Sequence, residues 1–186
     1  MPRVMEEVGA LDAARSDVTG SSYDGVLLVP AFFEAGRVTA GDAHWARVGG
    51  EWLPVGHAEF ARDATFGYVA SNLKDFVVEK SRGAISVGDI RSIGLDDIRV
   101  GGPARVAEIL HGVTNGAFVV VNATEYGDLE IVVLALHDVE RSGRAFLYRT
   151  GPSFVRALAG LEPQDPLRTT DIWPDGHPGG HGLVVD

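Results

Sequence analysis

The strongest constraint on the fold of this chain is an alternation of short apolar runs with segments of helical periodicity. The runs Val26 to Val29 and Phe118 to Val121 contain no polar residue, which is typical of strands buried on both faces of a parallel sheet. The clearest helical pattern, over 128–141, places its apolar residues at Leu129, Val132, Val133 and Leu136. Alternating strands and helices predict an α/β domain of three layers around a mostly parallel, Rossmann-like sheet.

One segment interrupts this alternation. Residues 37–55 form short alternating pieces separated by glycines and a proline, which predicts a β-hairpin excursion. The remaining pattern predicts a helix near 4–11 before a loop at 16–22, a helix over 71–83 capped by Ser71, a strand over 91–95, a helix over 101–112, a strand over 145–148 and a helix over 153–159.

The composition changes near residue 162. Residues 162–182 hold four of the nine prolines, which is typical of a linker. We therefore predict a partial α/β domain over 1–161, a Gly/Pro-rich linker over 162–181, and the start of a truncated second domain over 182–186. The first domain is expected to be truncated as well, because the chain opens on a helix with no strand before it.

Charge and composition exclude several classes of function. The formal net charge is −10, and no basic cluster interrupts it, so nucleic acid is not an expected partner. The chain has no cysteine, and its apolar runs are far shorter than the ~20 residues of a membrane span. We expect a cytoplasmic protein without disulfides that does not cross a membrane.

Histidine spacing gives no support for a metal site. Only His177 and His181 cluster with acidic residues, Asp171 and Asp175, and they lie in the predicted linker. A flexible segment seldom holds a preformed site, so no metal is expected.

Ligands of open α/β sheets bind beyond the carboxyl ends of the strands, and two candidate segments precede the helix predicted over 71–83. Arg37, with Glu34 near it, follows the first strand and would reach a polar ligand, or would simply begin an exposed hairpin. Arg62 and Asp63 lie in a polar and aromatic segment, 60–68, where Arg62 would bind a carboxylate or form a surface ion pair.

Two further candidate pairs follow later strands. Asn122 and Thr124 lie between a strand and the best helix, where they would orient a hydroxylated ligand, although Thr124 would equally serve as a helix cap. Arg149 and Thr150 follow the strand at 145–148, where Arg149 would bind a carboxylate or phosphate, or pair within the protein. The chain contains neither a P-loop sequence nor a Gly-x-Gly-x-x-Gly motif after a strand, so neither common phosphate-binding loop is present.

Taken together, four segments resemble the four-carbon acid sugar kinase family in order and spacing. They are LVPAFFEAGRVT at 28–39, FARDATFGY at 60–68, DLE at 128–130 and FLYRT at 146–150. The resemblance extends from about Val26 to Leu167. Such a series of distinct motifs is more specific than any one of them alone.

The resemblance implies a two-domain enzyme that uses ATP and Mg²⁺ to phosphorylate the terminal hydroxyl of threonate, erythronate or a 3-oxo-tetronate. An N-terminal α/β domain would bind the sugar acid, and a second domain would bind ATP. The resemblance also implies that Arg62 and Asp63 belong to an Arg-Asp substrate loop and that Arg149 and Thr150 face the interdomain cleft. The family's opening strand, with its Asp-Asp-x-Thr-Gly motif, and its ATP domain are absent from these 186 residues.

Three hypotheses follow. The chain is the substrate-binding portion of a kinase and inactive alone, or a non-catalytic sugar-acid binding module, or a degenerate fragment. Because the family's ATP domain and the common phosphate-binding loops are absent from these 186 residues, we expect no tight binding of ATP by this chain. Phosphoryl transfer depends on a bound nucleotide and metal, so we expect little catalysis by the chain alone. The absent strand would expose a sheet edge, which predicts self-association or pairing with a complementing chain.

Overall fold

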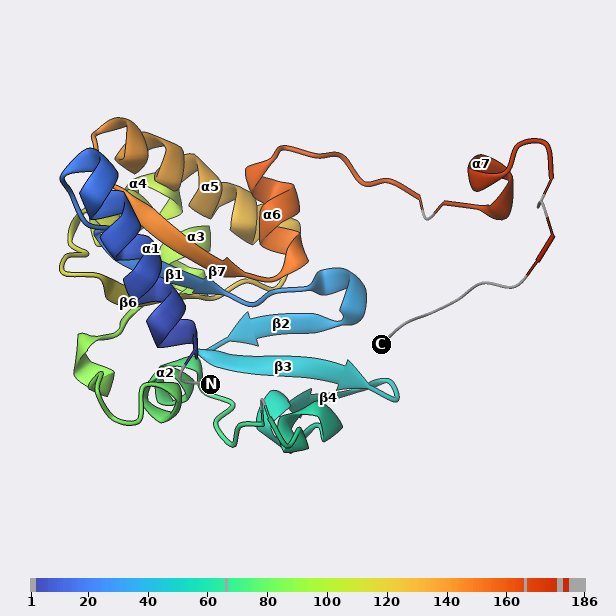
Figure 1. Cartoon of the computed structure of the whole chain (residues 1–186), viewed down its shortest axis with the longest axis horizontal. Helices are drawn as coiled ribbons and strands as arrows, with labels where there is room; N and C mark the ends of the chain where they lie inside the picture. Colours follow the sequence, from blue (N-terminus) through green and yellow to red (C-terminus); the bar gives the residue numbers. More distant parts are fainter. Residues whose placement is uncertain (1–2, 66, 166, 177–178, 181–186) are drawn as a thin grey trace.

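A four-stranded parallel sheet forms the centre of the protein (Figure 1). The computed structural model describes residues 3–65, 67–165, 167–176 and 179–180. In spatial order the strands are β5 (Arg91–Ile93), β6 (Ala117–Val121), β1 (Gly25–Val29) and β7 (Phe146–Thr150). All three pairings are parallel, so the predicted α/β fold with a mostly parallel sheet is confirmed.

Helices cover one face of this sheet. They are α3 (Leu95–Arg99), α4 (Gly102–His111), α5 (Tyr126–Arg141) and α6 (Pro152–Leu158). Leu27 and Val29 of β1 point into the core on this side, where they pack with buried residues of all four helices, such as Leu136 of α5 and Phe154 of α6.

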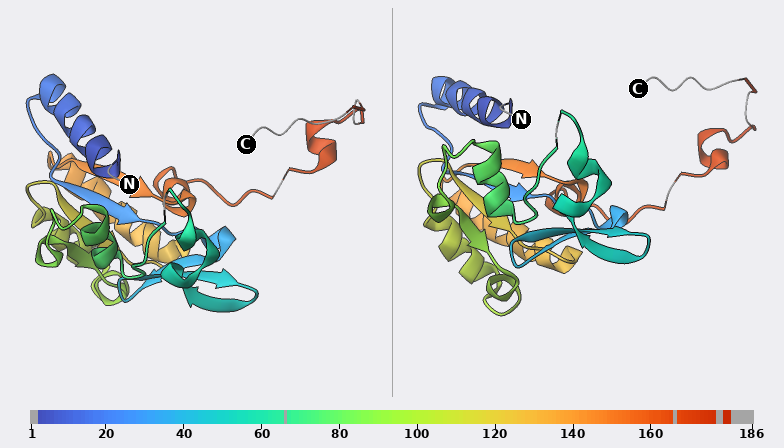
Figure 2. Two further views of the ribbon diagram at one scale, coloured as in Figure 1. Left: turned by 60° about the horizontal axis from the view of Figure 1, so that its bottom comes forward. Right: turned by 90° about the horizontal axis from the view of Figure 1, so that it is seen from below.

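The opposite face is covered by α1 (Arg3–Thr19) and α2 (Leu73–Lys80) (Figure 2). Val26 and Leu28 of β1 pack there with Leu73 and Val77 of α2, and Val8 of α1 joins them. Successive residues of β1 point to opposite faces of the sheet. Both faces are covered by helices, so β1 is buried at every position. This burial explains its continuous apolar sequence.

A separate antiparallel sheet contains β2 (Arg37–Ala40), β3 (Ala43–Val48) and β4 (Glu51–Pro54). The predicted excursion at 37–55 is therefore confirmed, with three strands and two tight turns. Thr39 anchors this sheet to the end of β6, since its backbone exchanges hydrogen bonds of 2.9 and 3.0 Å with that of Ala123. The short 3₁₀ helices are η1 (Phe33–Ala35), η2 (Val55–His57), η3 (Glu59–Arg62) and η4 (Val87–Asp89).

Several predicted boundaries were wrong. Helix α1 continues to Thr19, through the start of the segment predicted as a loop, and the predicted strand over 91–95 ends at Ile93 because α3 begins at Leu95. Asn72, rather than Ser71, caps α2, because its side-chain oxygen accepts a 2.9 Å hydrogen bond from the N–H of Lys74. The Ser71 hydroxyl instead accepts from the N–H of Gly56.

The segment after 161 contains α7 (Thr169–Ile172). The strand expected over 182–186 lies outside the described residues, so the proposed start of a second domain stays a prediction. None of the helices described here has both the length and the apolar character to span a membrane.

Candidate functional site

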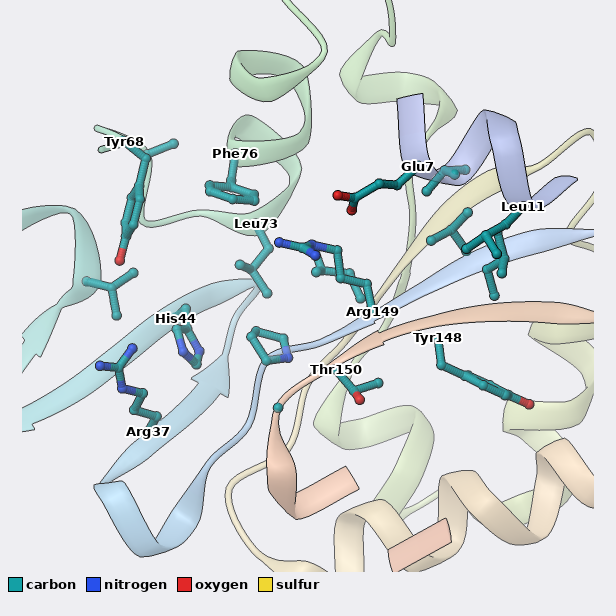
Figure 3. Close-up of a pocket in the computed structure, with 18 residues that line it drawn as sticks. Glu7, Leu11, Arg37, His44, Tyr68, Leu73, Phe76, Tyr148, Arg149 and Thr150 are labelled. Atoms are coloured by element: carbon teal, nitrogen blue, oxygen red, sulfur yellow. The ribbon is translucent and has the colours of Figure 1, made fainter. Parts of the chain in front are cut away.

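A pocket of about 620 Å³ lies on the α1 and α2 side of the main sheet, at the carboxyl ends of β1 and β7 (Figure 3). The chain segments after these two strands approach closely, because Gly151 donates a 2.8 Å hydrogen bond to the carbonyl of Val29. A Cβ at Gly151 would lie 2.3 Å from the carbonyl oxygen of Ala31. Glycine is therefore required where β7 leads into α6.

The pocket has an apolar wall and a small set of polar side chains. Leu28 and Leu147 of the sheet, with Leu73 and Phe76 of α2, form much of the wall. The polar side chains come from five separate segments, and they are Glu7, Arg37, His44, Tyr68, Tyr148, Arg149 and Thr150. The Tyr148 hydroxyl donates to the Glu140 carboxylate and is therefore used within the protein. A mainly apolar pocket with a few polar groups is typical of small-molecule sites.

His44 and Arg37 enter the pocket from paired strands. Arg37 lies two residues before Thr39 on β2, and Thr39 pairs with His44 on β3, so all three share one face of the sheet. The His44 Nδ1 atom lies 3.0 Å from the Thr39 hydroxyl oxygen. Burial, reinforced by the charge of Arg37, lowers the pKa of His44 from 6.5 to about 4, so the imidazole is neutral at pH 7.

Tyr68 reaches the same end of the pocket from the segment before α2 (Figure 3). Burial raises the pKa of its hydroxyl, and the nearby Arg37 charge acts in the opposite direction. The last turn of α2 holds this segment, because the Glu79 carboxylate accepts a 3.0 Å hydrogen bond from the N–H of Ala70 and the Lys80 ammonium donates to the carbonyl of Gly67. Side chains of α2 thus hold the backbone on both sides of Tyr68, which fixes the position of this residue.

Arg149 and Thr150 are the last two residues of β7, so the predicted strand over 145–148 was two residues too short at its end. Strand alternation places Arg149 on the same face as Leu147, which turns its side chain toward the pocket (Figure 3). Among the residues that the structure describes, the Arg149 guanidinium forms no hydrogen bond or ion pair. The pocket therefore contains a cationic group with no internal partner in the described chain.

Asn122 lies behind the pocket rather than among the residues that line it. Its side chain is 1% exposed, accepts a 2.8 Å hydrogen bond from the N–H of Asp42 and donates to the Asp42 carboxylate and the carbonyl of Ile93. Asp42 occupies the β2–β3 turn with a φ of 61°. Asn122 thus holds the turn between the strands that carry Arg37 and His44.

Thr124 contributes to a second polar cluster outside the pocket. The Asp128 carboxylate, 2% exposed, accepts hydrogen bonds from the Thr124 N–H at 2.8 Å and from the Arg99 Nε at 2.8 Å. Burial alone would raise the pKa of Asp128, but these hydrogen bonds and the Arg99 charge lower it overall. The cluster fixes the start of α5 against α3.

Arg62 and Asp63 lie at the end of η3 and beyond it, and both are exposed. Neither lines the pocket. Asp63 accepts a 2.8 Å hydrogen bond from the N–H of Thr65. The structure therefore brings Arg37, Arg149 and Thr150 together, and places Arg62 and Asp63 apart from them.

Besides Tyr148, sequence reasoning missed three polar residues of the pocket. Tyr68 ends the FARDATFGY segment, and His44 alternates with apolar residues on a strand that pairs with that of Arg37, so both had a signal nearby. No sequence signal pointed to Glu7, because its position in the pocket depends on how α1 packs against the sheet.

Two features bear on cofactors. No three His, Asp or Glu side chains in the described part of the chain come together in a group suited to a metal ion; His177 and His181 lie outside that part. The sequence also lacks the common phosphate-binding loops. Because neither feature is present in the described residues, we derive no phosphoryl-transfer step from this chain.

Comparison with known proteins gives both a family and a fold. Residues 7–158 match the family model described as "Sugar-binding N-terminal domain". A Haemophilus influenzae protein of the DUF1537 family has a similar structure, with a TM-score of 0.58 and 17% identity over 79% of this chain. A domain of unknown function (DUF1537) from Bordetella bronchiseptica, a domain-swapped dimer with bound citrate, has a TM-score of 0.53 and 18% identity over 74%.

The match spans about a third of each of these two proteins, 32% and 30% of their lengths. No curated protein matches the chain.

Proposed function

Because this chain belongs to the family of sugar-binding N-terminal domains, we propose that its pocket binds a four-carbon sugar acid, the acceptor substrate of an ATP-dependent kinase. The family match confirms the resemblance that the sequence motifs indicated. The ligand class that we propose is threonate, erythronate or a 3-oxo-tetronate.

The observation that carries this proposal is the approach of two guanidinium groups to one pocket. Arg37 and Arg149 enter it from different sheets, and Arg149 has no partner among the described residues. A guanidinium with its planar set of donors suits a carboxylate better than an ammonium does. The hydroxyls of Tyr68 and Thr150 would bind the hydroxyl groups of the same ligand.

The size and chemistry of the pocket agree with a small hydroxylated acid. Its volume of about 620 Å³ leaves room beyond a four-carbon chain, so the far end of the ligand would stay accessible to a phosphoryl donor. The Bordetella protein binds citrate, which is a small hydroxy acid with carboxylates. A hydroxy acid bound by a protein of similar fold supports an acid as the ligand class that we propose here.

We further propose that ATP and Mg²⁺ are held outside this chain, as in a two-domain kinase, and that the chain alone is inactive. In phosphoryl transfer the metal and nucleotide supply most of the charge neutralisation. The contribution of the residues described here would be to bind and orient the acceptor. The alternative is that the chain is a non-catalytic binding module. In that case it would bind the same sugar acid, but no assembly that contains it would phosphorylate the acid.

Isothermal titration calorimetry of the 186-residue chain with D-threonate, D-erythronate and citrate tests the proposal. We expect binding of at least one four-carbon acid, and a rise in the unfolding midpoint, since ligand at 100 times its dissociation constant adds ~2.7 kcal/mol. Arg149→Gln should weaken this binding. The control is Arg91→Gln, which changes an exposed arginine outside the pocket and should leave the affinity unchanged.

Absence of binding by both four-carbon acids would refute the proposal, whether or not citrate binds. To separate the kinase from the binding module, the chain is mixed with a separately produced ATP-binding domain of a DUF1537 protein and assayed for ADP release. ADP release that depends on the sugar acid and is lost in Arg149→Gln would support the kinase.

We propose self-association through the outer edge of β7, which is an end strand of the parallel sheet. Unpaired N–H and C=O groups at such an edge can pair with another chain. The domain-swapped dimer of the Bordetella protein is consistent with this behaviour. Size-exclusion chromatography with light scattering should give twice the mass of 19.7 kDa; a strictly monomeric chain up to high concentration would contradict it.

A further inference from the structure

Glu7 places a carboxylate in the same pocket as the two guanidinium groups. It projects from α1, and Figure 3 shows its carboxylate directed into the pocket on the same side as the Arg149 guanidinium. Within the described chain the Glu7 carboxylate forms no hydrogen bond or ion pair. Its charge is therefore not neutralised by a specific internal contact.

The charges that line the pocket add up to one positive charge. Arg37 and Arg149 contribute two positive charges and Glu7 one negative charge. His44 is neutral because its pKa is lowered to about 4, and Tyr68 is neutral because burial raises the pKa of its hydroxyl. A ligand with one negative charge balances this set, whereas a ligand with two leaves an excess.

We infer that Glu7 is a specificity-determining residue that favours sugar acids with a single carboxylate over ligands with a second negative charge. The inference rests on the proposed function, because it concerns the same pocket. A ligand hydroxyl near Glu7 can donate a hydrogen bond to its carboxylate. A ligand carboxylate at that position would bring two like charges together, which disfavours binding of a ligand with a second carboxylate.

The exposure of Glu7 limits the size of this effect. Glu7 lines the pocket but is itself exposed, so water screens the interaction between its charge and that of a ligand. We therefore expect the change in relative affinity to be about two- to fivefold, as for exposed charge pairs. A charge effect of this kind should also weaken as salt is added.

Threonate and tartrate form a matched pair of probes. They share a four-carbon skeleton, and tartrate of the same threo configuration has a carboxylate where threonate has its terminal CH₂OH group. Their dissociation constants are measured by calorimetry at low salt for the wild-type chain, for Glu7→Gln and for Glu6→Gln. Glu6 is the matched control, because it is an exposed neighbour on α1 that does not line the pocket.

We expect the wild-type chain to bind threonate more tightly than tartrate. Glu7→Gln should improve tartrate binding about two- to fivefold relative to threonate, and Glu6→Gln should leave the ratio unchanged. The effect of Glu7→Gln should diminish at high salt. Circular dichroism of each variant confirms that α1 remains folded.

Two results would overturn the inference and leave the proposed function standing. One is an unchanged threonate-to-tartrate ratio in Glu7→Gln while threonate still binds. The other is an equal change in Glu6→Gln, which would assign the effect to the overall charge of α1. Failure of both acids to bind any variant would overturn the inference together with the proposed function.

Discussion

Arg37 and His44 project into one pocket from paired strands, close enough for the charge of the arginine to act on the imidazole. His44 is also buried, with 5% of the residue exposed, and burial and the charge of Arg37 both disfavour the protonated imidazole. His44 thus contributes a neutral, hydrogen-bonding ring to the pocket at pH 7. The same two effects link the stability of the fold to pH.

We predict that stability falls as the pH drops from about 6.5 to about 4, and that His44→Asn reduces this fall. The pKa of His44 is about 4 in the folded chain against an ordinary value of 6.5, so between these values the unfolded chain binds the proton more readily. Protonation then favours unfolding, by about 2 to 4 kcal/mol in total at the acid end of the window. Above pH 6.5 the group has no such effect.

Urea unfolding at several pH values between 7 and 4.5 checks this prediction. The carboxylates whose pKa is lowered, such as Asp42 and Asp128, lose their contribution at lower pH, and they do so equally in both proteins. The difference between wild type and His44→Asn therefore isolates the imidazole. Parallel profiles for the two proteins would show that His44 does not titrate in this window.

The relative effects of Arg149 and Arg62 on ligand affinity form a second prediction. The sequence resemblance implies that Arg62 belongs to a substrate loop, whereas the geometry places Arg149 in the pocket and Arg62 outside it. We expect Arg149→Gln to lower the affinity for the sugar acid tenfold or more, since a charged hydrogen bond contributes about 1.5 to 3 kcal/mol. Arg62→Gln should have a smaller effect.

Calorimetric titration of both variants with the same acid makes the comparison. A larger loss in Arg62→Gln would mean that the 60–68 segment changes its position when ligand binds. Thermal unfolding without ligand serves as the control, because neither substitution removes an internal hydrogen bond described in this structure.

The central elements of the fold could be predicted because their patterns are local. Val26 to Val29 is apolar at every position since β1 is buried on both faces, and α5 shows its buried residues at helical spacing. Helix α3 escaped prediction because it has five residues and depends on Ile98, fully buried in the core, and on Asp97, whose carboxylate accepts from the N–H of Gly94. Such a short helix has too few positions to show a period.

The pocket was only partly predictable because its residues come from distant segments. The rule that ligands lie beyond strand ends led to Arg149 and Thr150. Both residues line the pocket because they stand at the carboxyl end of β7. The same rule led to Asn122, which also follows a strand, yet its side chain is used inside the protein to hold Asp42. Sequence position cannot distinguish these cases, because burial decides whether a polar group faces a ligand or another part of the chain.

The Asp128 cluster gives a third prediction, on stability. Asp128→Ala removes a buried carboxylate that accepts from Arg99 and from the N–H of Thr124. We expect a loss of about 2 to 4 kcal/mol in the free energy of unfolding, because a backbone donor at the start of α5 loses its partner. The control is Glu108→Ala, which removes a 71% exposed carboxylate paired with Arg105 and should cost less than about 1 kcal/mol. Equal losses in urea unfolding would contradict this ranking.

Asn122 provides the last prediction, which separates a structural role from contact with ligand. Asn122→Ala leaves the N–H of Asp42 without its partner and removes the tie between the β2–β3 turn and the carbonyl of Ile93. An unsatisfied buried group costs about 1 to 3 kcal/mol, so we expect a fall of that size in the free energy of unfolding. Ligand affinity should fall less, through looser placement of Arg37 and His44. Urea unfolding and calorimetry on one preparation check both quantities, with Thr150→Val as the pocket variant for comparison. If Asn122→Ala abolished binding and left stability unchanged, Asn122 would be a direct ligand contact, as its position after β6 first suggested.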